Sequence, residues 1–363
     1  MSNKIWQIAA GEPGRYFSKI FFDHDIILLG PGDYGDIKKM LNEYQSKGLS
    51  VQKVNEIKRF ADSEVLVEGD IILLRETYKV VGIGVVGNSE YIWDENYDDI
   101  YGWDLQHCRR VIWQDHLLND LIEIQKKEEL FSGRKQIHMF TEVADSKVIN
   151  RVKHLFPMLK KRKLKDRIHN VEKPLSLKEL SEALYVEGLA IEKCRSFIDV
   201  IEEQRRLLSW YKLNGYESKR PTEHEIVGFM ALPLFLSLGW SKQLLSLEWH
   251  KIDLAGFESV PSTTSSCVFI CEAKALNSGM QKVFDQADLY RSKHNIDNCR
   301  KIVTTDGRCI YIYEKNSDGI WGEHPVGYIN IMKIRKNHLV PVKTNAVKSL
   351  MSLTPEGIYK KLA

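Results

Sequence analysis

Cysteine is scarce in this 363-residue chain, and its placement excludes a zinc finger of the usual spacing. The six cysteines stand at positions 108, 194, 267, 271, 299 and 309, so that no C-x-x-C pair occurs. No histidines accompany them at ligand spacing. We therefore expect reduced thiols and a cytoplasmic location.

Long hydrophobic runs are also missing. The longest apolar stretch, Met230 to Trp240, is well short of the roughly 20 residues that a membrane-spanning helix needs. It predicts a buried helix end, broken by Pro233 and Gly239. The N-terminus has no sustained apolar core of the kind found in signal peptides. We therefore expect no membrane partner.

An excess of one charge is absent, since 52 Lys and Arg nearly balance 49 Asp and Glu, for a formal net charge of +3. Any basic face must come from local clustering. One cluster stands out: Arg151 to Arg167 holds eight Lys or Arg and one Asp. Two interpretations remain open for it, a solvated linker and a bridge whose lysines follow nucleic-acid phosphates.

A strand pattern late in the chain places acid and base together. Alternate residues of a strand share a face, so within Cys267 to Lys274 the side chains of Glu272 and Lys274 point the same way. A preceding strand ending near Asp253, closed by a turn at Ala255 and Gly256, adds a second carboxylate if the two strands pair as a hairpin. Two carboxylates at one point suit Mg²⁺.

This pattern resembles the Asp, spacer, Glu-x-Lys core of the PD-(D/E)xK nuclease superfamily. Downstream, Gln286 and Tyr290 match the Q-x-x-x-Y helix of many members, and their spacing puts both on one helical face. The resemblance implies a restriction-endonuclease-like α/β domain. Its metal ligands would be Asp253 and Glu272, and Lys274 would orient the attacking water.

Glu225 has two possible roles. It resembles the glutamate of the first helix in restriction-type nucleases, which would let it complete the metal shell through water. It also completes the motif Thr222-x-x-Glu225, a capping box that satisfies free amides at a helix start. A second such box, Ser176-x-x-Glu179, opens a helical pair with a glycine turn at Gly188.

The N-terminal third is rich in short strands separated by glycine and acidic turns, which predicts a small β-barrel. Segments such as GPGDYGD, EGDIILLR and GWDLQHCRRVIW resemble PUA-like domains of the EVE type, which read modified bases. The resemblance implies a flipped base held by aromatic walls and a polar edge reader. The candidates are Tyr16, Trp93, Trp103 and Asp104.

Beside them, His107, Arg109 and Arg110 could contact phosphate or form a solvated strand end. From Ile191 to Leu208, apolar residues recur at three- and four-residue steps, which predicts an amphipathic helix. This stripe is the first candidate for a dimer interface.

Together these patterns predict a multidomain α+β and α/β protein. Its expected parts are an N-terminal PUA-like β-barrel over residues 1–150, a basic helical linker over 151–220 and a nuclease domain over 221–363. The expected function is Mg²⁺-dependent cleavage of DNA that carries a modified base, by a homodimer. Two alternatives remain: a non-catalytic nucleic-acid-binding protein with a nuclease-like fold, and an RNA-directed nuclease.

Overall fold

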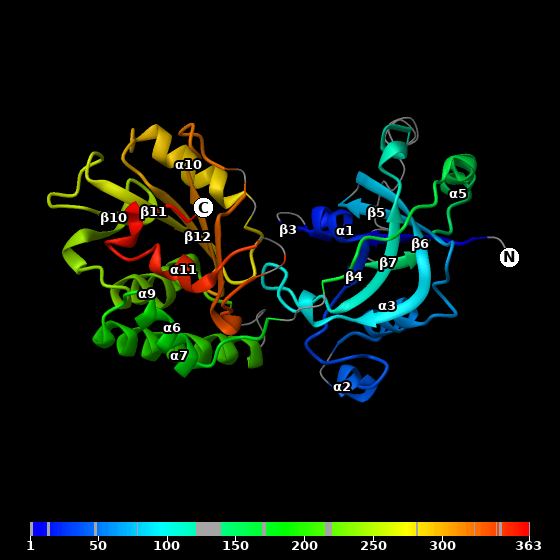
Figure 1. The fold of residues 1–363 in the computed structure, drawn as a ribbon, viewed down its shortest axis with the longest axis horizontal. Coiled ribbons are helices and arrows are strands. Elements are labelled where there is room, and N and C mark those ends of the chain that lie inside the picture. The colour runs from blue at the N-terminus through cyan, green and yellow to red at the C-terminus, as the bar shows by residue number, and fades with distance from the viewer. Residues whose placement is uncertain are drawn as a thin grey trace. The chain divides into compact units, whose positions relative to one another are not determined.

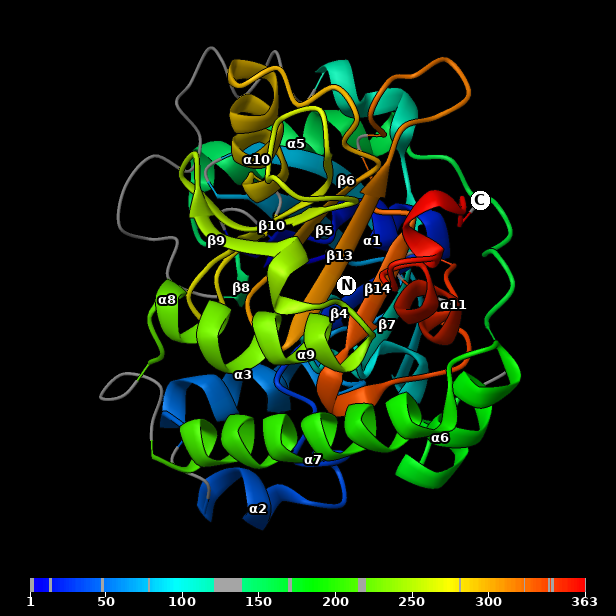
Figure 2. The same cartoon turned by 90° about the vertical axis from the view of Figure 1, so that its left-hand side faces the viewer.

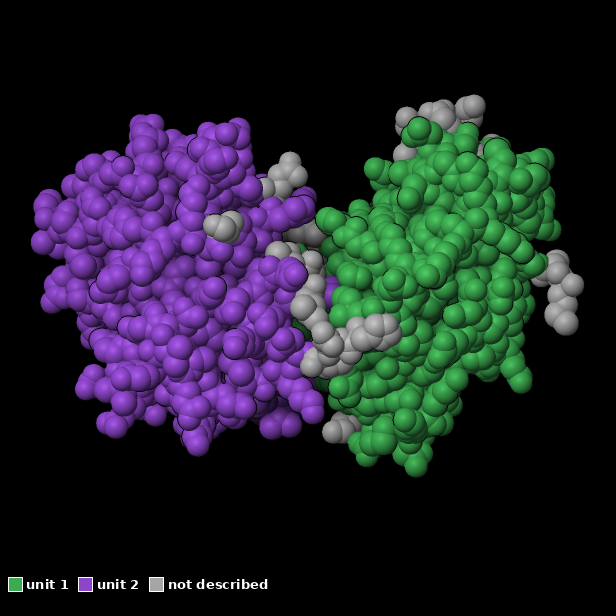
Figure 3. All heavy atoms as spheres, in the orientation of Figure 1, with its two compact units in different colours: residues 1–171 green, residues 172–363 purple. Residues whose placement is uncertain are grey.

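The computed structural model describes residues 3–12, 15–46, 49–77, 79–120, 139–168, 172–214, 220–280, 282–322, 324–338, 340 and 343–362. The chain divides into two compact units, residues 1–171 and 172–363 (Figure 3). The division falls inside the segment predicted as a linker, residues 151–220. Residues up to 168 therefore belong to the first unit, and the helical pair belongs to the second.

Unit 1 is a mixed α/β unit built on a six-stranded sheet of order β4-β7-β6-β5-β1-β8 (Figure 1). Its strands are β1 Ile5–Ala9, β4 Ile26–Leu29, β5 Ile71–Glu76, β6 Lys79–Trp93, β7 His107–Trp113 and β8 Phe140–Glu142, with a separate short pair, β2 Gly11–Glu12 and β3 Arg15–Tyr16. Its helices are α1 Ser18–His24, α2 Leu41–Ser46, α3 Val51–Ala61 and α5 Ser146–Leu155. β1 and β5 run parallel, and the other neighbours in the six-stranded order are antiparallel.

Alternation along the strands of unit 1 supplies apolar side chains to both faces of its sheet. Ile71 and Leu73 pack with the buried side of α5 in one cluster. On the other face, Trp6 stacks on Phe140 at 4.8 Å between ring centroids, and Phe140 meets Phe60 of α3 edge-on. The sheet is thereby covered on both sides, which accounts for its nearly continuous apolar strands.

Unit 2 is an α/β unit with a six-stranded sheet of order β14-β13-β12-β11-β10-β9. Its strands are β9 Leu245–Trp249, β10 Ile252–Phe257, β11 Cys267–Ala273, β12 Lys301–Thr305, β13 Cys309–Glu314 and β14 Gly327–Asn330. Its helices are α6 Leu177–Val186, α7 Ile191–Leu213, α8 Glu223–Ile226, α9 Leu232–Ser237, α10 Val283–Lys293 and α11 Ala346–Met351. In both ribbon views α10 lies on one side of the sheet, and α7 and α9 lie on the other (Figures 1 and 2).

The helical pair α6 and α7 is part of the core of unit 2. The predicted capping box at Ser176 and Glu179 is present, and Gly188, at a φ of 103°, ends the first helix as expected. Along α7, however, Cys194, Ile201 and Leu208 are buried in unit 2's own core. The prediction that this stripe forms a dimer interface is therefore wrong, because its apolar side chains already have partners within the chain.

A π-helical segment, Val227–Ala231, joins α8 to α9. Pro233 follows in the first turn of α9, and the helical path continues to Ser237. The prediction that Pro233 breaks this helix is therefore wrong. Pro233 has no N–H to donate to a preceding turn, and the wider π turn before it accommodates that loss. Gly239, with a φ of 109°, follows the end of α9.

All six cysteines are free thiols, and all are buried. Burial raises the pKa of several of these thiols, including Cys271 and Cys299. In the described part of the chain, no helix combines the length and the apolar character needed to cross a bilayer.

Candidate functional site

Strands β10 and β11 bring the two predicted carboxylates side by side. The strands pair antiparallel, as predicted, with Leu254 opposite Cys271. The next pair in this register is Asp253 opposite Glu272, and directly opposed residues share a face of the sheet. Lys274 comes two residues after Glu272, so its side chain points to the same face. Strand register therefore gathers the three residues from two separate segments of the chain.

The turn between these strands lies later than predicted. β10 continues through Ala255 and Gly256 to Phe257, so that Asp253 stands near the start of the strand and the connection spans residues 258–266. A Cβ on Gly256 would lie 1.9 Å from a carbon of the Phe269 ring. The glycine is there to admit this ring, and the turn prediction is wrong for that reason.

Glu272 is the centre of the polar contacts. Its Oε1 accepts a hydrogen bond from Lys274 Nζ at 3.2 Å and another from Gln286 Nε2 at 2.6 Å. Gln286 also lies 3.4 Å from the Tyr290 hydroxyl, one turn further along α10. The helix that covers this face of the sheet thus contributes the two residues predicted from the Q-x-x-x-Y pattern. The structure brings Asp253, Glu272, Lys274, Gln286 and Tyr290 into one cluster.

The second oxygen of Glu272 has no such contact. The residue is 3% exposed, and its Oε2 has no hydrogen-bond partner among the described residues. Burial and, after it, the charge of Asp253 raise the pKa of Glu272 to about 7, against the opposing effect of Lys274. Burial likewise raises the pKa of Asp253, although its Oδ2 accepts a hydrogen bond from the Ala273 amide at 2.7 Å. The site therefore holds two carboxylates whose negative charges are poorly compensated.

Lys274 supplies part of the missing positive charge. Burial by itself would lower the pKa of Lys274, but the neighbouring Glu272 carboxylate outweighs burial and raises it. The ammonium also lies 3.4 Å from Glu223 Oε2. At neutral pH Lys274 is therefore a fixed cation among three carboxylates.

Glu223, and not Glu225, supplies the carboxylate that contacts Lys274. Glu225 Oε2 accepts hydrogen bonds from the Thr222 amide at 2.7 Å and the Thr222 hydroxyl at 3.0 Å, which completes the predicted capping box. Glu223 was not among the site residues predicted from the sequence. The capping box could have pointed to Glu223. Because Glu225 is engaged in the cap, Glu223 is the other carboxylate in the first turn of α8 that can reach Lys274.

The residues present fit a bound Mg²⁺. Glu272 shares a face of the sheet with Asp253, and one of its buried carboxylate oxygens has no hydrogen-bond partner among the described residues. Hard oxygen ligands are the kind that Mg²⁺ prefers. In the part of the chain that the structure describes, no group of three or more His, Cys, Asp or Glu side chains gathers as a metal cage. Mg²⁺ commonly binds one or two carboxylates and completes its shell with water and substrate phosphate.

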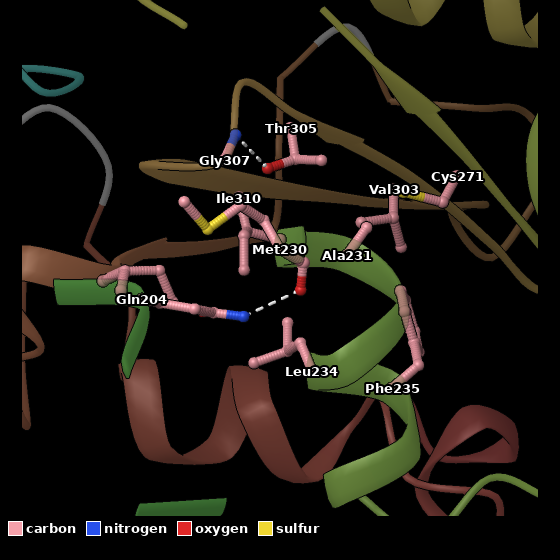
Figure 4. A pocket seen from close by; sticks show the side chains of 11 residues that line it. Gln204, Met230, Ala231, Leu234, Phe235, Cys271, Val303, Thr305, Gly307 and Ile310 are labelled. Atoms are coloured by element: carbon pink, nitrogen blue, oxygen red, sulfur yellow. Dashed lines mark hydrogen bonds between the residues drawn. The ribbon is translucent and has the colours of Figure 1, made fainter. Parts of the chain in front are cut away.

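The opposite face of β11 is core. Cys271 lines a small cavity of about 10 Å³, together with Met230 and Phe235 (Figure 4). Gln204 Nε2 donates to the Met230 carbonyl at 2.8 Å across it. A space of this size holds at most a single water molecule. It is a packing gap behind the carboxylate cluster.

The four predicted base-contacting residues of unit 1 have different surroundings. Trp93 meets His107 edge-on at 5.2 Å, and Trp103 meets Phe17 edge-on at 5.8 Å. The Tyr16 hydroxyl lies 2.5 Å from the Thr77 hydroxyl. The Asp104 carbonyl accepts a hydrogen bond from Gly32 N at 2.8 Å, and its side chain is half-buried. These contacts alone do not outline a common pocket for a base.

His107, Arg109 and Arg110 are neither phosphate contacts nor solvated. His107 is fully buried, and its two ring nitrogens lie 2.9 Å and 2.8 Å from the hydroxyls of Tyr44 and Tyr91. Burial lowers its pKa to about 4. The guanidinium of Arg109 donates to main-chain carbonyls, among them that of Phe60 at 3.1 Å. Both expectations for this trio are wrong, because β7 is an interior strand and the polar ends of all three side chains have internal partners.

Comparison with known proteins gives one match. A family model described as a domain of unknown function (DUF8426) matches residues 6–141, which lie within unit 1. No curated protein and no solved structure matches the chain.

Proposed function

We propose that the chain is a Mg²⁺-dependent endonuclease whose second unit hydrolyses DNA and whose first unit selects DNA that carries a modified base. The observation that carries the proposal is the cluster of Asp253, Glu272, Lys274 and Gln286, in which one buried oxygen of Glu272 has no hydrogen-bond partner within the described part of the chain. The resemblance to PD-(D/E)xK nucleases, drawn from the same residues, supports it.

In this proposal Asp253 and Glu272 hold the metal. When bound, Mg²⁺ would lower the pKa of a coordinated water and neutralise charge on the phosphate. Lys274 would hold the attacking water and stabilise the negative charge that develops on the phosphate. Gln286 fixes the orientation of the Glu272 carboxylate through its 2.6 Å hydrogen bond. Glu223 restrains the Lys274 ammonium from the other side.

The reader role of unit 1 rests on its resemblance to PUA-like, EVE-type domains. Two tryptophans are half-buried here: Trp93 is the last residue of β6, and Trp103 lies in the connection from β6 to β7. Unstacked bases gain about 1–3 kcal/mol each on aromatic faces, so that such side chains suit a flipped base. A homodimer belongs to the proposal because one such site cuts one strand, and its interface lies elsewhere than on the buried stripe of α7.

The test is Lys274→Ala. The variant should keep its fold and its DNA binding, and Mg²⁺-dependent cleavage should fall at least about 100-fold, the usual cost of losing one preorganised transition-state donor. Lys293→Ala is the matched control, because Lys293 is an exposed lysine at the end of α10. Cleavage is measured on matched modified and plain DNA, with RNA as a further arm. Wild-type rates in Lys274→Ala would contradict the assignment.

A further inference from the structure

The basic segment of unit 1 is held against the rest of that unit by hydrogen bonds. Residues 159–168, here called the basic strap, follow α5 and a 3₁₀ turn and form neither helix nor strand. Gln114 pairs with both backbone groups of Lys160, at 2.9 Å and 2.8 Å. At the other end, Asn96 Nδ2 donates to the Ile168 carbonyl at 3.0 Å. The strap is therefore held at both ends by unit 1.

Its two arginines turn inward and are neutralised. Arg162 donates through both terminal nitrogens to Asp25, at 2.5 Å each, and the Asp25 side chain is fully buried. Burial would raise the pKa of Asp25, but the hydrogen bonds from Arg162 and the Lys165 amide outweigh it and lower the pKa. Arg167 pairs with Asp94 at 3.1 Å, and the Asp94 side chain is only 7% exposed.

Its lysines have a different environment. Lys160, Lys161 and Lys163 are exposed to solvent, and the Lys163 side chain is 91% exposed. Its nearest carboxylate, Asp166, lies 3.9 Å away and is 92% exposed. Such an exposed pair is screened by solvent and holds Lys163 only weakly. The strap thus separates its charges: the two arginines bind the protein's own carboxylates, Lys165 Nζ donates to the Phe22 carbonyl at 2.8 Å, and the other three lysines are exposed.

We propose that Lys160, Lys161 and Lys163 form a phosphate-binding surface that holds the backbone of nucleic acid on unit 1 without reading its sequence. The nucleic-acid partner rests on the proposed function. The anchored backbone holds these lysines in fixed positions, so that binding orders side chains only and not a loop. Lysine suits this role, because it contacts phosphate as a point charge, whereas the fork-shaped guanidinium suits the paired carboxylates.

The prediction is quantitative, because each phosphate that a lysine neutralises adds about 0.9 to the slope of log affinity against log salt concentration on duplex DNA. Replacing Lys160, Lys161 and Lys163 together by Ala should lower that slope by about 2 to 3. The loss should be equal on plain and modified DNA. Binding is measured by fluorescence anisotropy in the full-length Lys274→Ala background, so that cleavage does not interfere.

The matched control replaces Lys19, Lys39 and Lys147, three exposed lysines of unit 1 outside the strap. The strap triple variant should have a slope lower by about 2 to 3, and this control should keep the wild-type slope. Equal losses in both would show a general charge effect and overturn the strap proposal, as would an unchanged slope in the strap variant.

Cleavage is measured in the chain that retains Lys274, and together with the salt slope it distinguishes the strap proposal from the nuclease proposal. If Mg²⁺-dependent cleavage occurs and the strap variant keeps its slope, only the strap assignment fails. If the slope falls as expected but no cleavage occurs, the nuclease assignment fails and the strap stands as a nucleic-acid-binding surface. Absence of any binding to nucleic acid at low salt overturns both.

Discussion

Glu272 shows how a buried carboxylate can oppose folding. One oxygen of this carboxylate is hydrogen-bonded to Lys274 and Gln286, and the other is buried without a partner among the described residues. Its pKa of about 7 in the folded chain lies above the ordinary 4.5. The folded state therefore holds a proton that the unfolded state has already lost between these values, and stability falls as pH rises through this window.

The first residue-scale prediction is that Glu272→Gln stabilises unit 2 at pH 8 without metal. Ionising Glu272 costs the folded state on the order of 2–3 kcal/mol, and the amide removes that cost. The variant should unfold at a higher temperature than wild type at pH 8 in EDTA, and the difference should be much smaller at pH 5, near the lower end of this window. Thermal unfolding at both pH values measures it.

The matching control is Asp285→Asn, which removes an exposed carboxylate from α10. It should shift unfolding little at either pH. Adding Mg²⁺ should stabilise wild type and not Glu272→Gln, because a metal that binds only the folded state raises its stability. A stability difference that is the same at pH 5 and pH 8 would show that Glu272 is not the titrating group.

Among the elements, strand alternation was the most reliable guide. The pattern of Cys267 to Lys274 correctly placed Glu272 and Lys274 on one face, because side-chain direction in a strand follows from the backbone alone. The turn predicted at Gly256 was wrong, because the sequence alone does not distinguish a glycine that forms a turn from one that leaves room for a neighbouring ring.

Long-range contacts could not be predicted in the same way. The sequence does not show that α7 packs against α6 and α9 in the core of unit 2, so that its stripe was interpreted as a dimer surface. Nor does it show that Arg162 reaches Asp25, which is 137 residues away along the chain. Both depend on which elements meet, and periodicity within one element carries no information about that.

The element-scale prediction concerns the π-helical segment. Gln204 of α7 is 2% exposed and donates to the Met230 carbonyl within this segment. Gln204→Ala leaves that buried carbonyl without its donor, which should cost about 1–3 kcal/mol. Urea unfolding should show a lower midpoint. Glu203→Ala, an exposed neighbour on α7, serves as the control and should change the midpoint little. Equal stability of Gln204→Ala and wild type would contradict the role of this hydrogen bond.

For the whole molecule, the proposal requires that one unit selects what the other cuts. Trp103→Ala should reduce cleavage of modified DNA by about 5- to 150-fold, the equivalent of 1–3 kcal/mol for one stacked base. Cleavage of plain DNA should not change, since the cluster at Glu272 belongs to unit 2. Rates are compared at fixed salt, because phosphate contacts would otherwise mask the difference.

Lys274→Ala gives the complementary result for this prediction. It should lose cleavage of both substrates while still binding modified DNA more tightly than plain DNA. Equal cleavage of modified and plain DNA by the wild-type chain would remove the reader role from unit 1.

The burial of all six cysteines makes the native chain a ready scaffold for site-specific dyes. A maleimide reagent requires an accessible thiolate. Burial keeps the reagent away from the sulfur and favours the unreactive thiol form. A cysteine introduced at an exposed lysine in each unit, such as Lys39→Cys and Lys293→Cys, would then react ahead of the native six. Energy transfer between two dyes at these positions would report, molecule by molecule, how the separation of the units responds to a bound duplex.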